Sequence, residues 1–309
     1  MRPTRRIVFS FIALAFLQGN VGSALSQYYD QSMANRYLSA TALVSFLGAG
    51  VLFAWIFVRG RRMLNMRQWG AILLLSVPQM AGILLSPQYS HIRWLSGAGW
   101  DTLFLLTLAM PLWLALLAAL QIIPVEVPRS IPAAAIAGLS AFFLVVPVTA
   151  VRVEQVPSLI AHLLLLLLTV YSWSFARQHL ASVTAAPAAA CSLLLNAISS
   201  LILSFLFERS SANAYLWNAL ALPMLFKVAV LVATTWLWFW LLKHMTLAAF
   251  SMNVLAMWTS AILSSFVFAT GFFLWRVDFA IMIAVTSLVV ALRASVEEEQ
   301  PVALGLAQL

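Results

Sequence analysis

The stretch VPSLIAHLLLLLLTVYSWSF, residues 156–175, decides the fold class of the chain. A helix needs about 20 apolar residues to cross the hydrocarbon core of a bilayer, and this stretch has that length. A transmembrane strand would instead show about ten residues of alternating hydrophobicity. Neither His162–Leu168 nor Ala219–Phe226 alternates. The stretch therefore predicts a membrane-spanning helix, and the chain is expected to be all-α.

The composition extends this expectation to the whole chain. Of its 309 residues, 63% are hydrophobic and 8% are charged, whereas an ordinary soluble domain is about half apolar and about one quarter charged. Disorder needs low hydrophobicity and many charges, and Cys191, the single cysteine, cannot form an internal disulfide. The composition predicts a polytopic membrane protein.

Polar or Pro/Gly-rich punctuation separates further apolar runs of spanning length. We expect ten transmembrane helices, at residues 7–26, 38–58, 68–87, 99–121, 130–149, 156–175, 185–206, 216–242, 247–267 and 273–292. The first run also resembles a secretory signal with a cleavage site before Gln27, and cleavage there would leave nine spans.

The basic residues predict the orientation of these spans. An even number of spans puts both termini on one side, and with the termini inside, the inner segments hold eleven Lys and Arg residues and the outer segments five. Because Lys and Arg concentrate in cytoplasmic loops, we expect a cell inner (plasma) membrane protein with both termini and the tail 296–309 in the cytoplasm. The same loops explain the net charge of +8 without nucleic acid as a partner.

An internal similarity divides the chain into two halves. Thr107–Met110 in the fourth predicted helix matches Val254–Met257 in the ninth at three of four positions, with an offset of 147 residues. This places the two halves five spans apart, and units with an odd number of spans enter the membrane with opposite topology. We expect two inverted five-helix repeats, 1–150 and 151–295.

Several stretches carry a family resemblance. The first helix contains Leu17–Asn20, the sixth contains Leu168–Arg177, and Thr234–Lys243 leads into Leu247–Ser251. With these stretches the chain resembles the ten-helix, two-repeat EamA-type proteins of the drug/metabolite transporter superfamily, although Gln18 stands where Trp is usual and Trp258 where Pro is usual. The resemblance implies a solute carrier, commonly an exporter, with alternating access through a central cavity between the repeats.

Lys227 is the charged residue whose predicted depth within a membrane span is hardest to explain. It lies about a dozen residues into the eighth predicted helix, roughly 18 Å deep at 1.5 Å per residue. One interpretation is a side chain that snorkels to the outer headgroups or pairs with Asp101 or Asp278; the other is a cavity cation that meets a substrate carboxylate.

Uncharged residues supply the remaining candidates for substrate binding. Buried amides in hydrocarbon either hydrogen-bond between helices, worth about 0.6 to 2 kcal/mol each, or contact substrate. The amide candidates are Gln18, Asn20, Gln79, Asn196 and Asn253, and the aromatic candidates for apolar walls are Tyr171, Trp173 and Trp258.

His162 is the candidate for proton relay, because imidazole titrates near neutral pH; hydrogen-bonded structure is its other interpretation. No metal-binding cluster, nucleotide motif or catalytic triad is expected, so the chain is interpreted as neither an enzyme nor a cofactor carrier. We expect a secondary transporter, monomeric or weakly dimeric, that exports an amino-acid-like metabolite or another organic anion or zwitterion. The alternative is a non-transporting scaffold or a lipid-modifying intramembrane enzyme.

Overall fold

The structure is a computed structural model, and it describes residues 5–22, 37–60, 62–85, 105–145, 153–207, 222–268 and 275–297. Within these ranges every regular element is helical, which confirms the all-α class. The elements are α1 (Arg5–Phe16), the π-helix η1 (Leu17–Gly22), α3 (Tyr37–Val58), α4 (Met66–Leu85), α6 (Met110–Ala119), α7 (Ser130–Val145), the 3-10 helix η2 (Val153–Gln155), α8 (Val156–Leu180), α9 (Ala185–Phe207), α11 (Leu222–His244), α12 (Leu247–Phe250), α13 (Asn253–Phe268) and α14 (Trp275–Glu297).

Each of the ten apolar segments predicted from sequence contains at least one helix, but three of them are not single α-helices within the described residues. The fourth has helical residues 105–108 and a turn at Ala109 before α6. The first changes from α to π geometry at Leu17. The ninth is divided into α12 and α13 by a turn at Ser251 and Met252. Thr246 caps α12 by accepting a hydrogen bond from the Ala249 amide, and the Ser251 hydroxyl donates to the Ala248 carbonyl over 2.6 Å. These side-chain bonds to the backbone favour a short helix and a turn over one long helix.

Within the described ranges, four stretches are long and apolar enough to cross a membrane: Leu38–Val58, Val156–Leu180, Ala185–Leu206 and Met224–His244. The helices also carry large apolar side chains on their outer surface, such as Phe57, which is 88% exposed, and Phe205, which is 80% exposed. Ser45, in contrast, is fully buried between helices. An apolar exterior over partly polar helix contacts is typical of a membrane protein, because lipid replaces water around it.

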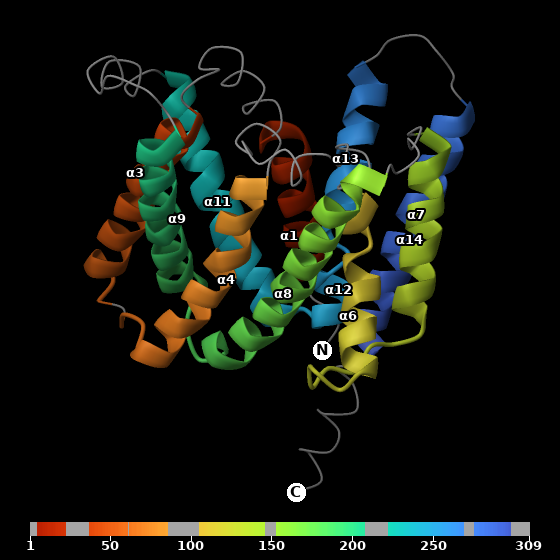
Figure 1. The fold of residues 1–309 in the computed structure, drawn as a ribbon, viewed down its shortest axis with the longest axis horizontal. Helices are drawn as coiled ribbons and strands as arrows, with labels where there is room; N and C mark the ends of the chain where they lie inside the picture. The colour runs from red at the N-terminus through yellow and green to blue at the C-terminus, as the bar shows by residue number, and fades with distance from the viewer. Residues whose placement is uncertain are drawn as a thin grey trace, which may run out of the picture.

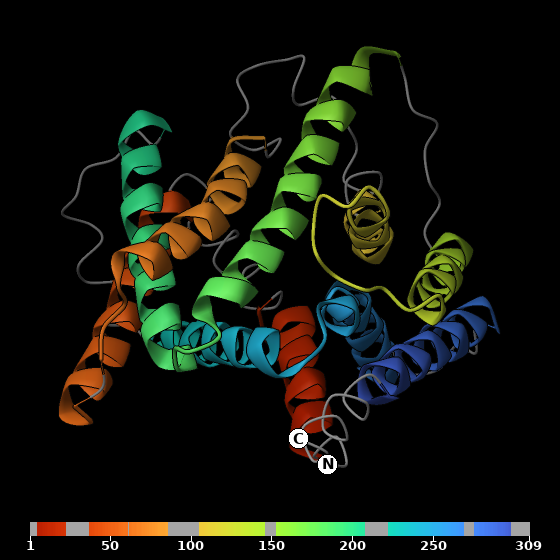
Figure 2. The ribbon, with the colours of Figure 1, turned by 90° about the horizontal axis from the view of Figure 1, so that it is seen from below.

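The helices pack in a definite set of neighbours, which Figures 1 and 2 show from two directions. The most extensive contacts join α3 to α9, α7 to α14 and α4 to α8. Further contacts join α11 to α1, α3 and α9, and α4 to α9. Both α1 and η1 pack against α13, α6 packs against α7 and α8, and α13 packs against α14.

The described connections 59–60, 62–65, 120–129 and 181–184 lie at the same end of the bundle as the start of α1 and the end of α14 (Figure 1). Basic residues gather at this end, which we call the basic end: Arg5, Arg6, Arg59, Arg62, Arg67, Arg129, Arg177, Lys243 and Arg293.

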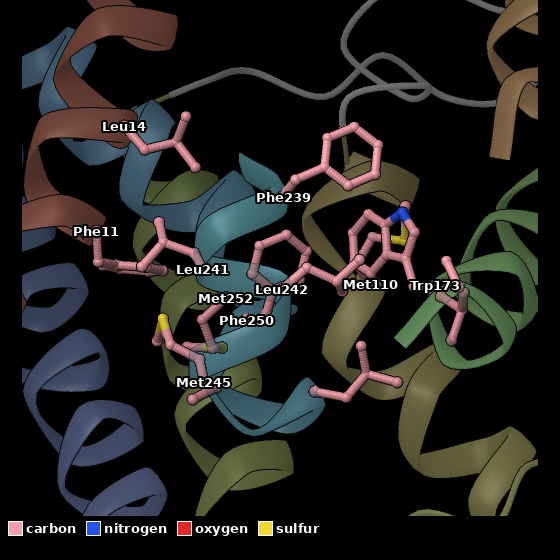
Figure 3. Packing of buried hydrophobic residues seen from close by; sticks show 14 of the residues in the cluster. Phe11, Leu14, Met110, Trp173, Phe239, Leu241, Leu242, Met245, Phe250 and Met252 are labelled. Carbon is pink, nitrogen blue, oxygen red and sulfur yellow. The ribbon is translucent and has the colours of Figure 1, made fainter. Parts of the chain in front are cut away.

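The main core cluster reaches across the bundle and includes the turn between α11 and α12 (Figure 3). Phe239, Leu242, Met245 and Phe250 are buried there. Trp173 of α8 packs onto this group, with its ring 5.3 Å from that of Phe250 in an edge-to-face arrangement. Aromatic pairs of this geometry contribute about 0.5 to 1.5 kcal/mol beyond the area they bury, so the cluster ties α8 to the α11–α12 turn.

Candidate functional site

The site begins where η1 of the first helix crosses α13. A π-turn widens the helix by one residue and is frequent at functional sites. Gly19 in η1 approaches the main chain of Met257 so closely that an added Cβ would collide with the Met257 carbonyl oxygen and lie 3.1 Å from its carbon. A residue without a side chain is therefore required for this crossing.

Two amides of η1 form hydrogen bonds across this crossing, and we call the four side chains involved the amide network. Asn253 Nδ2 donates to Gln18 Oε1 over 2.9 Å, and Asn20 Nδ2 donates to the Ser260 hydroxyl over 2.7 Å. Asn253, Met257 and Ser260 are spaced i, i+4 and i+7, so they share one face of α13. The structure thus joins three of the predicted substrate-binding amides into one constellation.

The acceptor atom Oδ1 of Asn253 takes no part in the two hydrogen bonds of the amide network. Its side chain is 6% exposed, and Oδ1 is buried with no hydrogen-bond partner among the described residues. A buried polar atom without a partner costs about 1–3 kcal/mol. The atom is a ready acceptor for an ammonium or amide N–H donor from a solute.

Lys227 lies in the second turn of α11, a helix that packs against α1 and η1. Its side chain is half-buried. Val230 and Thr234 follow at i+3 and i+7 on the same face of α11, and both are buried. Lys227 therefore belongs to the inward-facing stripe of α11, and its contact with a substrate anion stays a prediction.

Asn196 lies apart from the amide network, in the contact between α9 and α3. Its Nδ2 donates to the Ser45 hydroxyl over 2.9 Å. A second polar contact joins Ser39 and Ser204, whose hydroxyl oxygens are 2.6 Å apart. This is the helix-to-helix bonding that the sequence offered as the alternative to substrate contact.

The aromatic candidates are also separated in space. Trp173 is part of the core cluster beside Phe250, whereas Trp258 packs on Phe142 of α7 with ring centroids 5.5 Å apart. Tyr171 is 38% exposed and stacks on Phe175 at 6.5 Å. The structure does not bring these three side chains together.

His162 and Gln79 complete the predicted residues. His162 is half-buried in α8, with Nδ1 2.8 Å from the Ser158 carbonyl oxygen one turn earlier. Gln79 follows Pro78 inside α4, and its side chain lies outside the described part of the chain, as does Asp101.

Sequence reasoning did not anticipate several partners of these residues. Ser260 and Ser45 accept hydrogen bonds from Asn20 and Asn196. Nothing in the sequence distinguishes these two serines from the other hydroxyl side chains of the apolar helices. Asp278, a possible partner of Lys227 in the sequence analysis, is half-buried, and its Oδ2 atom is buried without a partner among the described residues. Its place in the first turn of α14 was visible in the sequence, but the burial of this oxygen was not.

Comparisons with known proteins show a similar fold but assign the chain to no family. No family model matches the chain, and no curated protein matches it. A solved structure described as "Crystal structure of protein" is similar, with a TM-score of 0.63, 20% sequence identity, and coverage of 92% of this chain and 97% of that one. At this identity the likeness shows the fold alone. It extends over nearly the whole of both chains.

Proposed function

We propose that the chain is a secondary transporter of the cell inner membrane that exports a small amino-acid-like or anionic metabolite by alternating access. The observation that carries the proposal is the buried Oδ1 of Asn253, for which the described part of the chain supplies no hydrogen-bond donor. Apolar helices tolerate such an atom where a solute or a second conformation supplies its donor. In this proposal, Lys227 supplies positive charge for the substrate carboxylate.

The ten-span topology is supported by the basic end. Helices that alternate in direction through a bilayer bring every second connection to the same side, and the described connections lie at one end with the start of α1 and the end of α14. The basic residues named above gather at this end, which we assign to the cytoplasm because Lys and Arg favour that side.

The inverted repeat is supported by the set of helix neighbours. If the five helices α1, α3, α4, α6 and α7 correspond in order to α8, α9, α11, α13 and α14, most contacts occur in pairs. The α3–α11 contact corresponds to the α9–α4 contact, and the α1–α11 contact corresponds to the α8–α4 contact. Likewise, the α1–α13 contact corresponds to the α8–α6 contact, and the α6–α7 contact corresponds to the α13–α14 contact. The pairs α3–α9 and α7–α14 correspond to themselves, as a two-fold axis between the repeats requires.

This arrangement would place the amide network between the repeats. Gln18 and Asn20 belong to the first five helices, and Asn253 and Ser260 to the second five. Alternating access moves one repeat against the other, so hydrogen bonds between the repeats would break and form during transport. A polar solute would replace the partners that the amides lose. The proposal follows the resemblance to the EamA-type drug/metabolite transporters.

Metabolite profiling of cells that overproduce or lack the protein would identify the exported solute. Uptake of that solute into proteoliposomes, with and without a pH gradient, would then measure transport directly. We expect Lys227→Met and Asn253→Ala each to lower the rate at least tenfold, with Asn196→Ala as the matched control that retains transport. Two results together would contradict transport and favour a scaffold. Metabolite levels would not change when the protein is overproduced or absent, and proteoliposomes that contain the protein would take up no solute.

A further inference from the structure

We propose that the hollow formed by α8, α9 and α11 at the basic end binds the phosphate group of an anionic phospholipid. The hollow is an open depression in the surface, and the roughly 270 Å³ of space over its lining includes open solvent. Its lining includes two cationic side chains, Arg177 and Lys243, and Thr184 between them along the chain. This proposal rests on the membrane orientation given under the proposed function and is independent of transport.

The floor of the hollow is apolar and its rim is cationic. Leu180, Phe239 and Leu242 are buried and form part of the lining, whereas Lys243 is exposed and Arg177 half-buried. A free phosphate or nucleotide needs polar groups on several sides. A phospholipid instead presents one phosphate at the headgroup level with glycerol and acyl carbons beside it, which matches a cationic rim over an apolar floor.

A hydrogen bond holds the ammonium group of Lys243 at the rim of the hollow. Its Nζ donates to the Val183 carbonyl over 3.3 Å, which draws the ammonium group from the end of α11 across to the turn between α8 and α9. Figure 2 shows this turn beside the C-terminal part of α11. Arg177 lies in the last turn of α8 and lines the hollow, and a guanidinium group has the planar fork of donors that suits phosphate.

The position of the hollow at the basic end of the bundle fits a lipid headgroup. Its basic residues end two helices on the side assigned to the cytoplasm, where the leaflet carries anionic lipids. Each basic residue near such a surface contributes to attraction that acts within about a Debye length. A phosphate bound here would bridge α8 and α11, whose ends the core cluster also joins.

The test uses the full-length protein in neutral detergent micelles, with bound lipid counted by native mass spectrometry during titration. We expect phosphatidylglycerol to bind and phosphatidylcholine to bind at least tenfold more weakly. The double variant Arg177→Gln/Lys243→Gln should lose at least tenfold in affinity for phosphatidylglycerol. The control Arg67→Gln/Arg293→Gln removes the same charge from exposed positions at the same end and should bind within twofold of the unchanged protein.

Equal losses in the double variant and in the control would overturn the proposal, because binding would then follow net charge alone. Displacement of the lipid by an equal concentration of inorganic phosphate would also overturn it, since the hollow would be a site for a soluble anion. Lys243→Gln alone, at an exposed position, preserves the fold if the double variant does not, and a loss of at least threefold is then expected. A protein that binds the lipid but transports nothing would leave this proposal intact.

Discussion

Asn253 donates a hydrogen bond to Gln18 over 2.9 Å, and the two residues are 235 positions apart in the chain. The bond joins the first helix to α13 beside the Gly19–Met257 crossing. The amide network exists only while these helices stay in close contact. The approach of the two backbones is thus the structural condition for the candidate site.

Gly19→Ala should break this approach. The new Cβ would meet the main-chain oxygen of Met257, which cannot rotate away as a side chain can. We expect a loss of about 1–3 kcal/mol in stability, typical of overpacking, together with loss of transport. The lowered midpoint of thermal unfolding in detergent measures the first effect. Met257→Ala should not restore stability, because the clash is with the backbone.

Gly50→Ala is the matched control for this substitution. Gly50 lies within α3, and a Cβ added there meets no atom of the described residues within 4 Å. Ala is favoured over Gly inside a helix by about 0.5–1 kcal/mol, so the midpoint should stay unchanged or rise. A fall as large as that of Gly19→Ala would show that the protein rejects any added methyl group and would remove the argument from the crossing.

Gly138→Ala should be destabilising for a different reason, which a second substitution can relieve. A Cβ at Gly138 in α7 would collide with the Cδ atoms of Leu255 in α13. Because Leu255 is buried, Leu255→Ala alone should cost about 2–5 kcal/mol through the cavity it leaves. The double variant should be more stable than the sum of the two single effects predicts, since the new methyl enters the space that Leu255 vacates. Strict additivity in unfolding experiments would contradict this contact.

The positions of the helices could be predicted from the sequence, because the length and apolar character of a run are properties of adjacent residues. The run 156–175 became α8, and 185–206 became α9. The π-turn at Leu17 and the break at Ser251 could not be predicted. Hydrogen bonds of the local backbone and the close crossing at Gly19 determine them, and a hydrophobic pattern carries neither.

The candidate site could be predicted only as a set of separate residues. Gln18, Asn20 and Asn253 stand out as amides in apolar helices, but their pairing depends on which helices become neighbours. Trp173 and Trp258 illustrate the opposite case. Both were expected to form apolar walls of the cavity, yet one packs on Phe250 and the other on Phe142. Burial in a helix does not specify the partner.

Gln18→Ala and Asn253→Ala should be energetically coupled. Each single variant removes the same hydrogen bond, so the double variant should lose less stability than the sum of the two. We expect a coupling of about 0.6–1.7 kcal/mol, the range for hydrogen bonds between membrane helices. A double-mutant cycle from unfolding midpoints measures it. Asn253→Ala with Asn196→Ala forms the control cycle, because Asn196 bonds to Ser45 instead, and the two effects should add within about 0.5 kcal/mol.

Asn196→Ala and Asn253→Ala should separate packing from transport. Both remove one half- or fully buried amide that donates to another helix. Asn196 closes the α3–α9 contact, so its loss should lower stability by about 1 kcal/mol and leave the transport rate per folded molecule within twofold. Asn253 also has the buried Oδ1 that no described residue contacts with a donor, so its loss should abolish most transport at a similar or smaller cost in stability, since an unsatisfied atom disappears with it. Transport rates in proteoliposomes, normalised to the amount of folded protein, distinguish a packing role from a transport role. Equal retention of transport in both variants would exclude Asn253 from solute binding and leave the amide network as a purely structural contact.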